Sequence, residues 1–283
     1  MSSADASKIV VALGKFDAMH RGHAQLARRA SKMGTPYLMS FSGMAEVLGW
    51  ESKLPVVAEC DRPRVCTSWA AGCNGQTVKE HCLPFAAIRR MSPEEFVLTL
   101  KEIGVGGVVA GRNYRFGFKA AGTADTLTEL GKKHGVDVEI VDLLQAEEDE
   151  CEDGAGGVCT PQVSSTRVRA CLAAGDVEQV TRLLGRPHRL MLRSDPGNAL
   201  TFPLSAALNQ YPKVGSYVGA VMMLDEDTEG GEMAGAGTAE VVVTLVVNEL
   251  GFALEVAAGD ERRLLDAVGR GSKVCVDITA RAL

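Results

Sequence analysis

Short apolar runs alternate with helical patterns along the first half of the chain. Strands are predicted where aliphatic residues run together, and helices where apolar residues recur every three to four positions. The strands expected on this basis are residues 9–13, 37–39, 108–110 and 136–141, and the expected helices are residues 22–33 and 123–134. Strands that alternate with helices are typical of a parallel sheet covered on both faces.

The sequence Ser92-Pro93-Glu94-Glu95 predicts the start of a further helix. Ser92 can accept a hydrogen bond as the cap, Pro93 suits the first helical position, and Glu95 can complete a capping box.

The pattern changes after residue 186. Short β-rich runs separated by Gly, Asp and Asn follow at residues 218–224, 239–247, 252–256 and 274–278. Two domains are therefore expected, residues 1–186 and residues 187–283. Between strands, residues 225–237 predict a loop, and the acidic residues 146–157 predict a solvated, mobile loop rather than a partner site.

Composition and charge narrow the function classes. The 283 residues carry a net charge of −6, which argues against sequence-independent electrostatic binding of nucleic acid. We expect no membrane partner, since no apolar run reaches the roughly 18 residues of a membrane helix. Residues 1–8 hold no secretory signal, and eight cysteines favour a reducing compartment, so an intracellular, soluble protein is expected. The irregular group Cys60, Cys66, Cys73, His81 and Cys82 favours small thiols over zinc, and no protein metal site is predicted.

Candidate chemistry begins where the first predicted strand ends, in the segment from Gly14 to His23. The carboxyl edge of a parallel sheet is where ligands bind, and the following helix start offers N–H groups and a positive dipole end to phosphate. His20 and His23, with Gly22 between them, can both face one phosphate. This H-x-G-H resembles the signature of a nucleotidyltransferase superfamily with a Rossmann-like fold.

Two further blocks lie at predicted element boundaries. Residues 164–169 read Ser-Ser-Thr-Arg-Val-Arg, which combines helix-capping hydroxyls with two arginines suited to a polyphosphate. Residues 111–118, directly after a strand, combine glycines, Asn113 and the aromatic residues Tyr114, Phe116 and Phe118. This loop either binds a planar heterocycle or packs Phe116 and Phe118 into the core.

In order and spacing, the three blocks together resemble the prokaryotic-type FAD synthetases. That family carries G-x-F-D-G-x-H-x-G-H, then G-x-D/N-F/Y-R-F-G, then S-S-T-R-V/I-R, and ends this domain with a segment similar to residues 175–187 here. The resemblance covers about residues 8–190. Residues 61–64 and 111–122 look like the plant and algal plastid branch, so a plastid location is implied by resemblance alone.

The resemblance implies transfer of AMP from ATP to FMN, with Mg²⁺ accompanying ATP and no covalent intermediate. The implied catalytic residues are His20, His23 and Arg167. The implied ATP-binding residues are Gly14, Phe16, Asp17, His20, Gly22, His23, Ser164, Ser165, Thr166, Arg167 and Arg169. The implied FMN-binding residues are Asn113, Arg115, Phe116 and Gly117.

Some positions depart from the family pattern. Ala18 replaces the family's second glycine, which is tolerable unless that backbone position has positive φ. Residues 41–45 replace a common F-D-P-H-P segment, which leaves some flavin or nucleotide contacts open.

The C-terminal third resembles a degenerate riboflavin kinase barrel. The kinase's phosphate-binding G-F-P-T-A-N corresponds to residues 201–206, where Leu204 and Ala206 replace the threonine and the asparagine. Continued strand alternation would turn Ser205 to the opposite face from its neighbours. Residues 211–217 still resemble the family's Y-P-x-x-G-x-Y, so the framework is expected without kinase chemistry.

Several alternatives stay open at this stage. They are another phosphorylated acceptor, such as nicotinamide mononucleotide or phosphopantetheine; a bifunctional riboflavin kinase/FAD synthetase; and a non-catalytic flavin- or nucleotide-binding regulator. The sequence does not indicate an oligomeric state.

Overall fold

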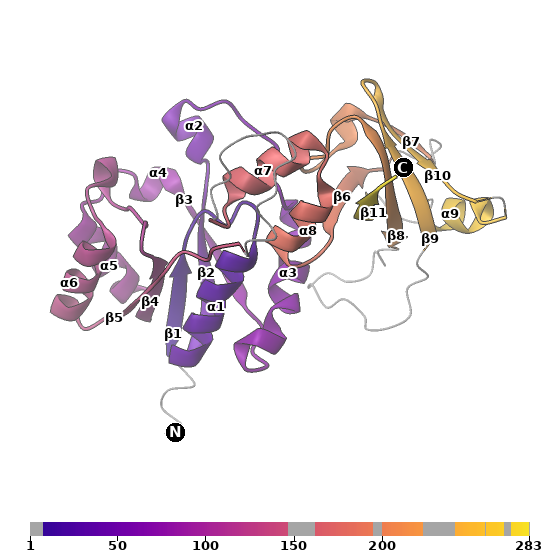
Figure 1. The fold of residues 1–283 in the computed structure, drawn as a ribbon. Helices are drawn as coiled ribbons and strands as arrows, with labels where there is room; N and C mark the ends of the chain where they lie inside the picture. Colours follow the sequence, from indigo (N-terminus) through magenta and orange to yellow (C-terminus); the bar gives the residue numbers. More distant parts are fainter. Residues whose placement is uncertain are drawn as a thin grey trace. The chain divides into compact units, whose positions relative to one another are not determined.

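The computed structural model describes residues 8–146, 162–194, 200–222, 241–257, 259–268 and 273–282. The chain forms two compact units (Figure 1). The first comprises Met1–Lys53 and Val65–Gln145, and the second comprises Leu54–Arg64 and Ala146–Leu283. Apart from Ala146, the predicted acidic loop lies outside the described residues, as does the predicted loop 225–237.

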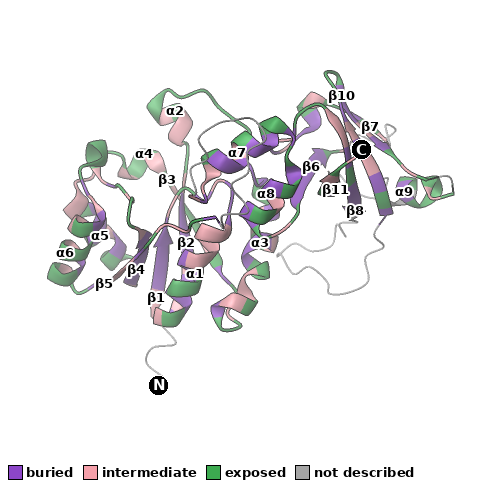
Figure 2. Cartoon of the chain, in the orientation of Figure 1, coloured by how far each residue is buried: buried purple, intermediate pink, exposed green. Residues whose placement is uncertain are grey.

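A parallel sheet with the strand order β3-β2-β1-β4-β5 forms the centre of the first unit. Its strands are β1 (Ile9–Leu13), β2 (Thr35–Ser42), β3 (Lys79–Pro84), β4 (Val105–Gly111) and β5 (Asp137–Val141). β1 lies in the middle and is almost wholly buried (Figure 2). The predicted parallel α/β architecture is confirmed.

The helices between β1 and β5 are α1 (Arg21–Met33), α2 (Met44–Leu48), α3 (Arg62–Ser68), α4 (Phe85–Ile88), α5 (Pro93–Glu102) and α6 (Ala124–His134). α1 packs against β1, β2 and β4, whereas α5 and α6 pack on each other and on β4 and β5. α5 begins with the predicted capping box: Glu95 N donates to Ser92 Oγ, and Ser92 N donates to the Glu95 carboxylate.

The second unit is built around an antiparallel sheet with the order β6-β11-β8-β9-β10-β7. Its strands are β6 (His188–Arg193), β7 (Thr201–Pro203), β8 (Gly215–Met222), β9 (Val241–Val247), β10 (Gly251–Glu255) and β11 (Lys273–Arg281). Its helices are α7 (Ser165–Ala174), α8 (Val177–Leu184) and α9 (Glu261–Val268). After β7, Ala207 bridges to Leu192 of β6, and Leu208 N donates to Met191 O at 2.9 Å, so the sheet curls towards a half-barrel.

The compact units do not coincide with the predicted domains 1–186 and 187–283. α7 and α8 group with the β-rich half, where α8 packs on β6 and β11. The segment Leu54–Arg64 also belongs to this unit, although it lies between β2 and β3 in the sequence. The division at residue 186 stays a prediction about functional modules.

Ser205 does face away from its neighbours, as expected, but not through strand alternation. Leu204–Ala206 form a 3₁₀ turn and not a continuation of β7, so strand alternation does not apply to them. Leu204 packs against the core of the sheet, Ser205 is exposed and Ala206 is buried.

Candidate nucleotide-binding site

The loop between β1 and α1 holds two residues in the left-handed region of backbone conformation. Phe16 has φ 48° and Met19 has φ 47°, and both side chains are fully buried. Such conformations cost roughly 1–3 kcal/mol each in non-glycine residues and persist only when the surrounding packing imposes them. The loop is therefore held in one shape by its own buried side chains.

His20 and His23 form a stacked pair at the start of α1. Their ring centroids lie 3.7 Å apart with an interplanar angle of 15°, and the ring of Phe16 meets His23 edge-on at 4.9 Å. His20 is the residue before the helix, and its carbonyl accepts hydrogen bonds from the N–H groups of His23 and Ala24. Both imidazoles thus sit where a helix start attracts anions.

Two glycines make room for these rings. A Cβ on Gly22 would lie 3.1 Å from Cε1 and 3.2 Å from Nδ1 of His20, and a Cβ on Gly14 would lie 3.1 Å from the ring of Phe16. Ala18, which replaces a family glycine, is not among the described residues with positive φ, and its side chain is fully buried. The substitution therefore meets the condition set for it, that this backbone position has no positive φ.

Of the predicted flavin-binding residues in the loop after β4, one is buried in the core and others are exposed. Phe116 is 5% exposed and packs on Phe96 at a centroid distance of 5.6 Å. Asn113 is exposed, and Arg115 is exposed but donates to the carbonyl of Ala120 from Nε and Nη2, at 3.0 and 2.6 Å. The structure therefore places Phe116 in the core, the alternative that the sequence had left open.

The rest of this loop is equally constrained. Gly117 has φ 74°, and a Cβ there would lie 2.9 Å from Pro93, so both backbone and space favour glycine. Phe118, by contrast, is 46% exposed, which does not fit the alternative that it packs into the core. Tyr114 stacks on Phe116 at 6.0 Å, and burial raises the pKa of its phenol.

The β1 and β4 loops start at neighbouring strand ends. Leu13 pairs with Ala110 in the parallel register, so the loop beginning at Gly14 and the loop beginning at Gly111 leave the same edge of the sheet. The loop with the predicted ATP-binding residues and the loop with the predicted FMN-binding residues therefore lie at the same edge of the parallel sheet.

The third predicted set lies on the second unit, at the start of α7. Ser164 caps the helix, with its Oγ accepting from Arg167 N at 3.3 Å. Ser165 and Thr166 follow in the first turn, and Arg167 is 8% exposed. Arg169 is bound within the unit: its guanidinium donates to Gln210 Oε1 at 2.7 Å and to Leu54 O at 3.0 Å.

The structure also shows a contact beside the β1 loop that the sequence analysis did not predict. Lys15, in the β1 loop, lies with its Nζ 4.9 Å from the centroid of the Trp50 ring, and Trp50 is 53% exposed. Gly43 and Gly49 flank α2, directly before Trp50, with φ 69° and 67°. The two glycines that bracket this five-residue helix are an indication of a short turn-bounded segment that the sequence already contained.

The cysteine group does not gather into a metal-binding cluster. Cys66 and Cys73 are buried, whereas Cys60 and Cys82 are exposed. In the part of the chain that the structure describes, no group of three or more His, Cys, Asp or Glu residues could hold a metal ion. Within the same residues, no helix is long and apolar enough to cross a membrane.

The first unit is thus Rossmann-like: a parallel sheet whose first strand leads through an H-x-G-H loop into a helix. Residues 78–153 match the family model for FAD synthetase. This segment of the chain is therefore similar to the FAD synthetase family.

Similar proteins extend this result. FAD synthetase 2, chloroplastic, of Arabidopsis thaliana is 46% identical over 231 residues, which are 77% of this chain and 62% of the relative. FAD synthetase 1, chloroplastic, of the same plant is 45% identical over 223 residues, or 74% of this chain and 62% of the relative. The bifunctional riboflavin kinase/FMN adenylyltransferase of Pseudomonas fluorescens is 32% identical over 198 residues, or 68% and 58%. The chain thus spans less than two thirds of the length of these relatives.

A solved structure shares the whole fold. A crystal structure described as a macrolide-efflux protein from Streptococcus pneumoniae matches with a TM-score of 0.72 and 22% identity, covering 98% of this chain and 94% of the other. At this identity the match shows the architecture alone.

Proposed function

We propose that the protein is an FMN adenylyltransferase: it transfers AMP from ATP to FMN and releases pyrophosphate. The stacked His20–His23 pair at the start of α1 carries this proposal, because it places two imidazoles beside a helix N-terminus at the ligand edge of a parallel sheet. The similarity to two FAD synthetases, at 46% and 45% identity, supports FMN as the acceptor.

The chemistry requires positioning and charge stabilisation, not a covalent enzyme intermediate. A phosphate oxygen of FMN attacks the α-phosphorus of ATP, the bond to the bridging oxygen of the β-phosphate breaks, and pyrophosphate leaves with the bond electrons. Donors aimed at the developing charge lower the barrier. In this proposal His20, His23 and Arg167 are those donors.

The remaining ATP contacts are proposed for the loop and helix-start residues. These are Gly14, Phe16 and Asp17 in the β1 loop, Gly22 in the first turn of α1, and Ser164, Ser165 and Thr166 at the start of α7. Phe16 is fully buried, so its contribution is to shape the loop around His23. Mg²⁺ is held mainly by substrate phosphates and water in such sites, so it enters with ATP.

FMN is proposed to bind at the loop after β4. Asn113 presents an exposed amide there, and Gly117 allows the turn that follows. Arg115 and Phe116 are already engaged by Ala120 and by the core, so their contribution is to hold this loop in shape. A plastid location is proposed because both Arabidopsis relatives are chloroplastic.

The test is turnover with defined acceptors. Purified protein with ATP and Mg²⁺ is incubated with FMN, nicotinamide mononucleotide or phosphopantetheine, and products are separated by chromatography. We expect FAD from FMN and no adenylylated product from the other two. Binding of FMN and ATP without turnover would instead identify a non-catalytic regulator.

A matched pair of variants ties the activity to the site. His23→Ala should reduce FAD formation on the order of 10²-fold, as loss of a charge-stabilising donor does elsewhere. His81→Ala removes an exposed imidazole on β3 and should leave the rate unchanged. Equal rates for wild type and His23→Ala would remove His23 from the mechanism.

A further inference from the structure

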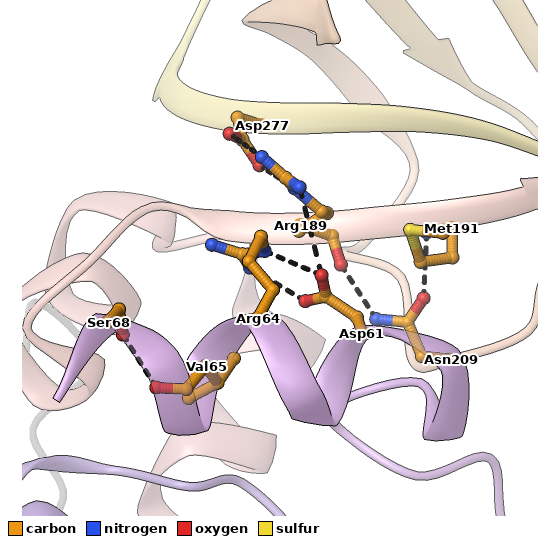
Figure 3. A network of polar contacts seen from close by, with 8 residues as sticks. All are labelled: Asp61, Arg64, Val65, Ser68, Arg189, Met191, Asn209 and Asp277. Atoms are coloured by element: carbon orange, nitrogen blue, oxygen red, sulfur yellow. Dashed lines mark hydrogen bonds and ion pairs between the residues drawn. The ribbon is translucent and has the colours of Figure 1, made fainter. Parts of the chain in front are cut away.

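Two consecutive residues of the β-rich unit, Asn209 and Gln210, hold three segments of that unit together. Asn209 is fully buried, and its Oδ1 accepts from Met191 N at 2.8 Å. Its Nδ2 donates to Val56 O and to Arg189 O, both at 2.9 Å (Figure 3 shows the contacts to β6). This amide therefore joins β6 to the segment Leu54–Arg64. We call the pair the Asn209–Gln210 clasp.

Gln210 extends the clasp to α7. Its N–H donates to Pro55 O at 2.8 Å, and its carbonyl accepts from His188 Nε2 at 2.7 Å. Its side chain binds Arg169 twice, accepting from Nη1 at 2.7 Å and donating to the Arg169 carbonyl at 3.3 Å. Arg169 in turn donates from Nη2 to Leu54 O at 3.0 Å.

An ion-pair network fixes the other end of the same segment (Figure 3). Arg64 binds Asp61 through two bonds of 2.6 and 2.7 Å, and Arg189 binds Asp277 through two bonds of 2.6 Å. Arg189 also lies 3.7 Å from Asp61, with side chains only 4% and 7% exposed. Nearly buried ion pairs add little net stability, because the cost of desolvation offsets much of their attraction.

The contacts of Arg169 with Gln210 and Leu54 reach α7, whose first turn carries the proposed ATP contacts. Arg169 lies one turn after Ser164 and Ser165 on a continuous helix. Because the helix is rigid, contacts that fix Arg169 also fix the position of the first turn of α7. Because the Arg169 guanidinium is occupied by Gln210 and Leu54, its expected role as an ATP ligand is better assigned to holding the helix.

We infer that the Asn209–Gln210 clasp is a positioning device for adenylyl transfer, with Gln210 setting the orientation of α7 through Arg169. The β-rich unit then has a role in this reaction that does not depend on any kinase chemistry of its own. The inference rests on the proposed function, since it needs α7 to bind ATP.

The test compares three variants of the full chain by steady-state kinetics and thermal unfolding. Gln210→Ala should raise the KM for ATP on the order of 10-fold, as loss of a bond to a charged group does, with the KM for FMN changed little. Gln210→Glu keeps the acceptor for Arg169 and should restore most of the ATP affinity.

Asn248→Ala is the matched control. Asn248 Oδ1 accepts from Leu250 N and Gly251 N in the β9–β10 turn, so this variant weakens the same sheet without touching Arg169. It should lower the melting temperature and leave the KM for ATP unchanged. The inference is overturned if the KM for ATP rises equally in Gln210→Ala and Asn248→Ala, or if it rises in neither. In both cases the proposed function stands as long as the wild type makes FAD. A wild type that makes no FAD overturns both.

Discussion

Substitution of Gly22 by alanine should separate activity from stability at the H-x-G-H loop. Alanine has the better helix propensity, by up to about 1 kcal/mol, and Gly22 does not have a positive φ, so α1 should not be destabilised. The added Cβ would nevertheless lie 3.1 Å from Cε1 and 3.2 Å from Nδ1 of His20. The imidazole must then move by a few tenths of an ångström.

His20 has little room for that movement. It is 7% exposed, and the ring of His23 stacks on it at 3.7 Å, so displacement of one imidazole displaces both. A misplacement of 1 Å at a reacting centre can cost about 10²-fold in rate. A shift of a few tenths should therefore lower kcat/KM on the order of 10-fold.

The assay is FAD formation from FMN and ATP, with unfolding in denaturant measured alongside. Lys32→Ala, at an exposed position in the last turn of the same helix, is the control and should keep wild-type kinetics. Wild-type activity in Gly22→Ala would show that the position of His20 is not used in the reaction. A large loss of stability would show that the strain lies in the helix and not at the ring.

Three further predictions follow from the local geometry. Ser164→Ala and Thr123→Ala each remove a helix cap at a cost of about 1 kcal/mol, but only Ser164→Ala should raise the KM for ATP; equal kinetics for both would leave Ser164 a cap alone. Burial lowers the pKa of His188 to about 4 from 6.5, so stability should be full above pH 6.5 and fall by roughly 3 kcal/mol towards pH 4. Denaturant unfolding across that range should show this slope in wild type and not in His188→Gln. Phe116 packs on Phe96 in the core, so Phe116→Leu, which keeps most of the buried volume, should leave the KM for FMN unchanged; a rise of roughly 3- to 10-fold in that KM alone would indicate contact with the flavin ring.

Local sequence patterns predicted the elements that place the H-x-G-H loop. β1 agrees with its predicted range, and α1 and the capping box of α5 are where the periodicity and capping residues put them. β3 escaped prediction because it is an edge strand with mostly exposed or half-exposed residues and no apolar run. β6 escaped because its polar residues are buried by distant partners, as Arg189 is by Asp277, 88 positions away.

The candidate site likewise contains features set by local sequence and features set by contacts between distant residues. The H-x-G-H and the α7 cap are local, so the sequence displays them directly. The assignment of Phe116 to the core and of Arg169 to Gln210 depends on contacts between distant positions, 41 residues apart in the second case. Neither residue type nor spacing can decide whether an arginine at a helix start binds phosphate or another part of its own chain.

The final prediction is that the protein makes FAD from FMN but does not make FMN from riboflavin. A kinase must hold Mg²⁺ through oxygen ligands. Leu204 and Ala206 provide no side-chain oxygen, and the structure places Leu204 against the core and buries Ala206. Ser205 presents the one hydroxyl of this 3₁₀ turn, and it is exposed.

Riboflavin, ATP and Mg²⁺ should therefore leave riboflavin unchanged, while FMN in a parallel reaction becomes FAD. The FMN reaction shows that the protein is folded and binds MgATP, so absence of riboflavin phosphorylation cannot then be attributed to an inactive preparation. If FMN or FAD does accumulate from riboflavin, Ser205→Ala shows whether that hydroxyl is the surviving ligand. Loss of the product in Ser205→Ala would place a working kinase site at this turn, because a single exposed hydroxyl would then have taken over what the family's threonine and asparagine supply.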